Sequence, residues 1–212
     1  MKRILVLGLL AALGAAAQVT TETIPFRVIA SSLNEVPALA APNSTGNVTV
    51  LMHLSRNAAG DVVGGSVDFI VRYRLGQETT ITMMHIHRGA AGVNGPIVID
   101  SGLPGRVENT VSGELKTQGV LARSAATTDL IKEILANPSG SYFNLHTLRA
   151  PGGEIRGQLM PAEEIVLLAQ MNPANEVPPV SGLNASALGA VTVRASRMAN
   201  GVVASAEVIF DA

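Results

Sequence analysis

The chain has 212 residues, a formal net charge of −1, 15% charged residues and no cysteine. So few and balanced charges argue against nucleic-acid binding, and the lack of cysteine excludes thiol catalysis, thiolate metal sites and disulfide bonds. Aromatic residues make up only 3% of the chain, which predicts an aliphatic core and disfavours stacking surfaces for sugars or bases.

The first residues have the composition of a secretory signal peptide. Lys2 and Arg3 precede an unbroken run of apolar and small residues from Ile4 to Ala17, and the final alanines suit signal peptidase. The run is shorter than the roughly 20 residues that a spanning helix needs. We predict a signal peptide over residues 1–17 with cleavage after Ala17, and a secreted or periplasmic mature protein without a membrane span. The alternative is an N-terminal membrane anchor.

Alternating hydrophobicity follows, with the two-residue period of half-buried strands. Val48, Val50, Met52 and Leu54 share one face of such a run, and a second run extends from Ser66 to Tyr73. Turn-forming residues separate these runs: Pro42-Asn43, Asn57 to Gly60, Gly64-Gly65, Gly92 to Pro96 and Pro104-Gly105. Helical spacing is clear only from Thr128 to Leu135, before Asn137-Pro138. We predict an all-β antiparallel sandwich or barrel with one short helix.

The sequence also contains an internal repeat. Asn34-Glu35-Val36-Pro37 recurs 141 residues later as Asn175-Glu176-Val177-Pro178, Phe69 corresponds to Phe210 at the same offset, and Gly46–Val50 recurs 143 residues later. Matched blocks in the same order indicate duplicated domains. We predict that residues 165–212 are the N-terminal part of a second, truncated repeat. Either the sequence is a fragment of a longer chain, which we prefer, or the half-repeat docks on the first domain.

Three of the four histidines lie in two later strand-like segments, apart from His53. His85 and His87 are two residues apart, so both rings lie on one face of a strand. His146 belongs to a second alternating segment, and the three imidazoles meet if the two strands are neighbours. Three neutral imidazoles suit copper or zinc and leave an open coordination position. Met83, on the same strand face as His85, would add a soft thioether ligand for Cu(I).

The same residues have a second interpretation. Histidines in strands often act as hydrogen-bonded structural residues, so the cluster is either a metal site or a polar structural cluster. His53 has no accompanying ligand and is expected to be structural. Arg156 either steers an anion toward a metal or, as we prefer, pairs with Glu154 on one strand face. The glycines from Gly89 to Gly95 lack the Lys-Ser/Thr of a phosphate-binding loop and predict a turn.

Three motifs together resemble the CHRD (chordin) domain family. They are Asn34–Pro37, His85–Val98, and Tyr142–Thr147 followed by Pro151–Leu159. The resemblance covers residues 26–160 once, and residues 165–212 match its first third again. It implies an immunoglobulin-like β-sandwich similar to that of copper/zinc superoxide dismutase. In that comparison His85, His87 and His146 match the positions of copper ligands.

The chain departs from the dismutase pattern in ways that restrict its function. The dismutase needs a bridging histidine, two further zinc-binding histidines and an aspartate, whereas this chain has four histidines in all. A dinuclear dismutase is therefore not expected, and no serine elbow or carboxylate pair indicates other catalysis. We predict an exported CHRD-domain interaction module without catalysis, acting on a protein or surface partner. The alternative is a periplasmic or secreted mononuclear copper or zinc protein.

Overall fold

The computed structural model describes residues 19–41, 43–121 and 125–211, so the predicted signal peptide over residues 1–17 lies outside the described residues. The described part confirms the all-β fold class with one short α-helix. No helix within it is long and apolar enough to cross a membrane.

Most of the elements are strands, with a few short helical segments between them. The strands are β1 (Thr20–Ser31), β2 (Thr45–Arg56), β3 (Val62–Arg88), β4 (Ile97–Asp100), β5 (Val107–Leu121), β6 (Ser141–Thr147), β7 (Ile155–Gln158), β8 (Met160–Met171), β9 (Ala187–Arg197) and β10 (Val203–Asp211). The helix is α1 (Ala125–Ala136), and 3-10 turns cover Ser32–Asn34, Pro138–Gly140 and Pro173–Asn175.

One antiparallel sheet contains all these strands, in the order β10-β9-β8-β1-β2-β3-β6-β7, with β4 and β5 also paired to β3. Strands β1, β2, β3, β6 and β7 close into a barrel because β1 also pairs with β7, at Ser31 and Arg156. β3 is long enough to pair with β2 and β5 along its first part and with β4 and β6 along its second. Each half of β3 therefore has a partner strand on both of its edges.

The barrel core is aliphatic and follows the predicted alternation. Val48, Val50 and Met52 of β2 are fully buried and lie beside Val67 and Phe69 of β3. Helix α1 begins three residues before the predicted Thr128 and adds buried isoleucines to the same core. Burial of these side chains is the main favourable contribution to folding, at roughly 1.5–3 kcal/mol for each one.

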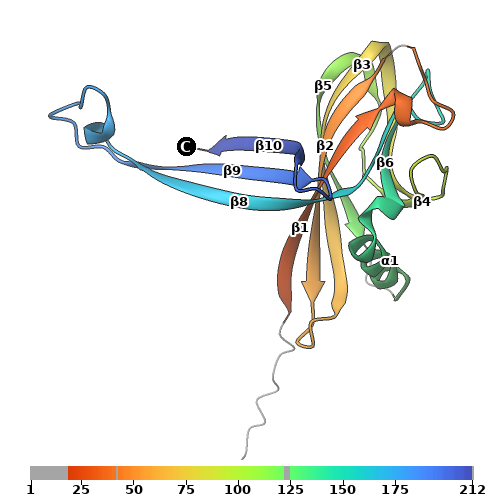
Figure 1. The fold of residues 1–212 in the computed structure, drawn as a ribbon, viewed down its shortest axis with the longest axis horizontal. Coiled ribbons are helices and arrows are strands. Elements are labelled where there is room, and N and C mark those ends of the chain that lie inside the picture. The colour runs from red at the N-terminus through yellow and green to blue at the C-terminus, as the bar shows by residue number, and fades with distance from the viewer. Residues whose placement is uncertain (1–18, 42, 122–124, 212) are drawn as a thin grey trace, which may run out of the picture.

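Strands β8, β9 and β10 form a separate three-stranded arm, here called the arm (residues 160–211). β8 follows directly from β7 and pairs with β1 only where Phe26 meets Pro161 and Arg27 meets Met160. Figure 1 shows β8 and β9 running away from the barrel to a looped tip, with β10 folded back along β9. The arm therefore contacts the barrel at its root alone.

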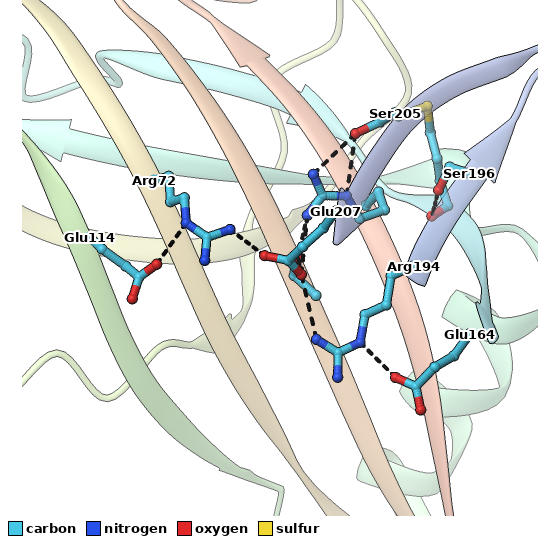
Figure 2. A network of polar contacts seen from close by, with 10 residues as sticks. Arg72, Glu114, Glu164, Arg194, Ser196, Ser205 and Glu207 are labelled. Atoms are coloured by element: carbon cyan, nitrogen blue, oxygen red, sulfur yellow. Dashed lines mark hydrogen bonds and ion pairs between the residues drawn. The ribbon is translucent and has the colours of Figure 1, made fainter. Parts of the chain in front are cut away.

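A buried ionic cluster joins the root of the arm to the barrel (Figure 2). The Glu207 carboxylate on β10 accepts a hydrogen bond from Thr49 at 2.9 Å and others from Arg72 and Arg194, with Arg27 Nη1 at 3.7 Å. Burial raises the pKa of Glu207, but the bonds from Arg72 and Thr49 outweigh it and hold the pKa below its ordinary value. Glu207 is therefore ionised and tied to β1, β2 and β3.

The turn after β1 recurs after β8 with the same backbone hydrogen bonds. The Ser32 carbonyl accepts from the Leu39 N–H at 2.9 Å, and 141 positions later the Pro173 carbonyl accepts from the Val180 N–H at 2.9 Å. The repeated sequence therefore forms the same local structure twice.

Candidate metal centre

The pairing of β3 with its neighbours places the candidate ligands on one face. His85 lies opposite Asn144 of β6 and opposite Asp100 of β4, while Met83 lies opposite His146. Directly opposite residues in antiparallel strands share a face, so His85, His87 and His146 are on the same side of the sheet. The intervening Met84 and Ile86 are fully buried in the core, as the alternation predicted.

The three imidazole rings form a compact, buried cluster. Ring centroids are 5.1 Å apart for His85 and His146, 5.6 Å for His85 and His87, and 5.7 Å for His87 and His146. One nitrogen from each ring lies within 4.8 Å of the other two. Metal–nitrogen bonds of about 2.0–2.1 Å place tetrahedral ligand atoms roughly 3.3 Å apart, a spacing that small side-chain rotations reach from here.

The outer nitrogen of each ring faces a hydrogen-bond acceptor. His87 Nδ1 lies 2.9 Å from the Gly95 carbonyl, and His146 Nδ1 lies 3.0 Å from the Pro151 carbonyl. A carbonyl only accepts, so both Nδ1 atoms carry the proton and both Nε2 atoms keep a lone pair. His85 has the reverse orientation, with Nε2 lying 3.8 Å from the Asp100 carboxylate.

The other nitrogen of each ring, here called the inner nitrogen, has no hydrogen-bond partner. His85 Nδ1, His87 Nε2 and His146 Nε2 are buried and have no hydrogen-bond partner. Buried polar atoms nearly always have a partner, and metal-binding histidines characteristically hold their other nitrogen with a carbonyl or carboxylate. Three buried nitrogens of this kind, two of them with a lone pair fixed by the Nδ1 hydrogen bonds, fit one copper or zinc ion.

The surroundings keep these histidines in the form that binds metals. Burial, together with the nearby His146, lowers the pKa of His85 to about 4. Burial also lowers the pKa of His87 and of His146. All three imidazoles are therefore neutral at pH 7, and neutral imidazole is the ligating form.

Met83 and Asp100 lie on the solvent side of the cluster. The Met83 side chain is 46% exposed, directly across the β3–β6 pairing from His146. The Asp100 side chain is 73% exposed. Both exposed residues therefore lie on strand positions that pair with a histidine of the cluster.

Aromatic stacking fixes the His87 ring. Tyr142 stacks on His87 with a centroid separation of 4.9 Å and an interplanar angle of 9°. The Arg156 guanidinium lies 3.4 Å from the centroid of the Tyr142 ring. This layered arrangement restricts rotation of His87, because each ring packs against a planar neighbour.

The predicted pair between Arg156 and Glu154 was wrong. Glu154 instead binds Arg149, and Arg156 donates to Asn94 Oδ1 and the Ala90 carbonyl at 3.0 Å each. Glu154 precedes β7 and turns toward the loop before it, whereas Arg156 points across the sheet into the loop after β3. Arg156 therefore supports the loop that carries the Gly95 carbonyl.

The glycine-rich segment after β3 is the predicted turn. At Gly95 an added Cβ would lie 1.5 Å from the Arg88 carbonyl, so only glycine lets the two backbones approach. The Arg88 N–H in turn donates to the Pro96 carbonyl at 3.0 Å. This close return brings the Gly95 carbonyl onto His87.

His53 lies apart from the cluster. Its Nδ1 is 2.8 Å from Thr23 Oγ1 and its Nε2 is 3.1 Å from Asp68 Oδ2, on the outer face of β1–β3. Both nitrogens thus already have partners. Sequence reasoning missed Asp100, although treating Gly89–Pro96 as a hairpin turn would have placed Asp100 opposite His85.

A second buried polar group lies beside the cluster. Glu35 is 7% exposed and lines a cavity of about 380 Å³ with Asn94, Arg149 and Glu154. Its Oε1 has no hydrogen-bond partner. Burial raises the pKa of Glu35 to about 7, although Arg156 and Asn144 oppose that effect.

Because of the Glu35 carboxyl, we predict that the folded protein is more stable at acidic pH than at alkaline pH. Between pH 4.5 and 7 the folded chain keeps a proton on Glu35 that the unfolded chain has released, so stability falls as pH rises through this window. Glu35→Gln removes the ionisation, and we expect it to be more stable than wild type at pH 8 by on the order of 2–3 kcal/mol. Urea unfolding from pH 4 to 8 measures the difference. Glu176→Gln, the exposed counterpart in the arm, is the control, and a pH-independent difference at Glu35 would contradict the prediction.

Comparison with known proteins identifies one family. The CHRD domain model matches residues 26–159, which include all three histidines of the cluster. No curated protein and no solved structure matches the chain.

Proposed function

The chain belongs to the CHRD domain family, and we propose that it is an exported protein that holds one copper or zinc ion between His85, His87 and His146. One observation carries the proposal. Each ring contributes a buried inner nitrogen with no hydrogen-bond partner, while its outer nitrogen faces a carbonyl or a carboxylate. A purely structural cluster would leave those three buried nitrogens without a hydrogen-bond partner, which costs roughly 1–3 kcal/mol for each group.

The residues around such a centre have different roles. Hydrogen bonds to backbone carbonyls orient His87 and His146, while the exposed Asp100 carboxylate lies 3.8 Å from His85 Nε2. A bound ion would supply Lewis acidity or, if it is copper, one-electron redox chemistry. Three protein ligands leave a position for water or for a further side chain.

Metal titration of the mature protein tests this function. We expect one equivalent of Zn(II) or copper to bind with a dissociation constant below 1 µM, equivalent to about −8.2 kcal/mol. The bound ion should also raise the unfolding temperature, because a ligand that binds only the folded state stabilises that state. Affinity weaker than micromolar for both metals would overturn the proposal.

Met83 is proposed as an additional ligand selective for Cu(I). Its thioether is soft, so Met83→Leu is expected to weaken Cu(I) binding roughly tenfold and to leave Zn(II) binding unchanged. Competition with a chromophoric chelator measures both affinities. Met198→Leu, a comparably exposed methionine in the arm, is the control. An equal loss for both metals, or no loss for Cu(I), would exclude Met83 from the site.

Export rests on the N-terminal segment. Lys2 and Arg3, the apolar run and the alanines at 15–17 support translocation with cleavage after Ala17. Expression with the native N-terminus, followed by mass spectrometry of the exported protein, should give a chain that begins at Gln18. Retention of the full-length chain in the membrane fraction would favour an anchor instead.

A second function, that of an interaction module without catalysis, is supported by the arm. Its strands present large apolar side chains to solvent, including Leu168 at 67% exposure and Phe210 at 77%. Apolar surface of this extent on a protein that is otherwise well packed typically marks an interaction site. In this function the chain binds a protein or surface partner.

A further inference from the structure

Three loops surround the cavity that Glu35 lines. The turn after β1 contributes Val36, the loop between β3 and β4 contributes Asn94, and the loop between β6 and β7 contributes Ala150. The cavity has a volume of about 380 Å³, which is within the usual range of roughly 300–1,000 Å³ for small-ligand pockets. It therefore has room for an organic ligand, and not only for a single water molecule.

Hydrogen bonds hold these loops in place around the cavity. Asn94 Nδ2 donates to the Val36 carbonyl at 2.9 Å, which joins the first loop to the second. The Gly153 N–H donates to the Ala150 carbonyl at 3.1 Å, within the third loop. The second and third loops also carry the carbonyls that accept hydrogen bonds from two histidines of the cluster. The cavity is therefore formed by the protein alone, without a ligand to shape it.

Glu35 brings a carboxyl group with a free oxygen to this cavity. It is 7% exposed, and the Asn144 side chain packs against its carboxylate. Glu35 Oε1 is buried and has no hydrogen-bond partner among the described residues. Buried polar atoms nearly always have a partner, and a buried charge is stable only when another group compensates it. A group bound in the cavity would supply the missing partner.

The other polar side chains around the cavity already have partners. The oxygens of Glu154 accept hydrogen bonds from Ser44, Thr147 and Arg149. Asn94 Oδ1 accepts from Arg156 Nη1 at 3.0 Å. Among the described residues that line the cavity, Glu35 is therefore the carboxylate with one oxygen left unpaired.

The nearby arginines do not supply the missing hydrogen bond. Arg156 attracts the Glu35 carboxylate through its charge, but its guanidinium donates to groups in the loop between β3 and β4. Arg149 donates to Glu154. Two carboxylates thus balance two guanidinium groups, so an added cation enters surroundings that are not positively charged. A hydrogen-bond donor with a positive charge is the group that best complements Glu35 Oε1.

The remaining lining favours a ligand with an aliphatic chain. Apolar side chains provide most of it, those of Val36, Pro37, Leu39, Ala41 and Ala150. Apolar walls with a few well-placed polar groups are typical of sites for small organic ligands. A calcium ion takes six to eight oxygen ligands, so one free carboxylate oxygen is too few to hold it.

We propose that this cavity binds a primary alkylammonium group, with Glu35 as the carboxylate that receives it. The ammonium donates to Glu35 Oε1, and the alkyl chain lies along Val36 and Leu39. A free aliphatic amine and a lysine side chain of another polypeptide share this chemistry, and two probes distinguish them. This binding is independent of the metal centre.

Titration of the mature protein with n-butylammonium chloride tests the proposal. EDTA excludes metal ions, and the amide resonances of Asn94, Gly152 and Gly153 report on the cavity. We expect saturable binding of one equivalent at pH 8, because the charged head pairs with Glu35. The neutral probe 1-butanol has nearly the same shape without the charge, and it should bind at least tenfold more weakly.

Glu35→Gln is the matched variant. It keeps the size of the side chain but removes its charge, and it is expected to be more stable than wild type at pH 8, so unfolding cannot account for a loss of binding. We expect it to bind n-butylammonium at least tenfold more weakly at that pH. Glu176→Gln changes an exposed glutamate in the arm and should bind the probe as wild type does.

The affinity for n-butylammonium should also rise with pH. Burial raises the pKa of Glu35 to about 7, so its ionised fraction, and with it the affinity, should be about tenfold higher at pH 8 than at pH 6. The ammonium stays charged over this range. The charged groups that face Glu35 are Arg156 on β7 and Glu154 with its partner Arg149. Glu35→Gln should therefore bind the probe equally at both pH values.

The outcomes distinguish the possible ligands. Nα-acetyl-lysine N-methylamide carries the same ammonium group on a peptide unit. Binding as tight as that of n-butylammonium would identify a lysine side chain as the ligand, and weaker binding would identify a free amine. Absence of saturable binding, equal binding of 1-butanol, or unchanged binding in Glu35→Gln would each overturn the proposal. Metal titration without amine remains a separate test of the metal centre.

Discussion

Replacing His85 or His146 with alanine is expected to weaken copper and zinc binding by at least 100-fold. Residues that merely orient a ligand already contribute 10–100-fold to metal affinity, and each of these residues is proposed to supply one of only three ligand atoms. Either substitution should also abolish the stabilisation by added metal, which for the wild type is about 2.7 kcal/mol at a metal concentration 100 times the dissociation constant. Isothermal titration and metal-dependent thermal unfolding measure the two effects.

His53→Ala is the matched control for these variants. His53 is also on a strand, but both of its nitrogens have hydrogen-bond partners, Thr23 and Asp68, on the outer face. Its replacement should leave the metal affinity unchanged. If His85→Ala and His146→Ala bind metal as tightly as wild type, the cluster is a structural one.

Glu207→Ala is expected to destabilise the docking of the arm by about 3–5 kcal/mol, the usual effect of breaking a buried ion pair. Its carboxylate and the Arg27 side chain are each 3% exposed. Without Glu207 the Arg27 guanidinium stays buried close to Arg72 and Arg194, with no opposing charge. Because the arm meets the barrel only at its root, the loss should appear as faster amide exchange in β8–β10.

The pair between Glu163 and Arg197 offers a comparison within the arm. Its side chains are 63% and 45% exposed and lie 3.6 Å apart. Glu163→Ala should therefore change stability by less than about 1 kcal/mol. Equal effects of the two substitutions would show that the root cluster does not hold the arm. Unchanged exchange in Glu207→Ala would show the same.

Much of the fold and part of the candidate site followed from local pattern. The alternation from Val48 to Leu54 assigned the buried face of β2 correctly, because side chains on a strand alternate strictly between faces. The same rule put His85 and His87 together. The helical spacing after Thr128 located α1 to within three residues at its start, an error normal for helix boundaries.

Other features depended on pairing between distant strands. Asp100 reaches His85 only through the β3–β4 pairing, and Met83 reaches His146 only through the β3–β6 pairing. Thr49 belongs to the outward face of β2 by alternation, yet it is fully buried because the arm covers it. No local sequence pattern predicts these contacts.

The sequence by itself determined that the chain is an all-β member of the CHRD family, which residues face its core, and which three histidines are candidate ligands. Only the tertiary structure decided that their inner nitrogens converge, that Arg156 supports a loop and does not pair with Glu154, and that the arm docks through Glu207. The physical reason is the separation along the sequence of the residues that each feature depends on. Periodicity and turns act between neighbours in the chain, whereas convergence of side chains depends on strand register and barrel closure, which join residues far apart in sequence.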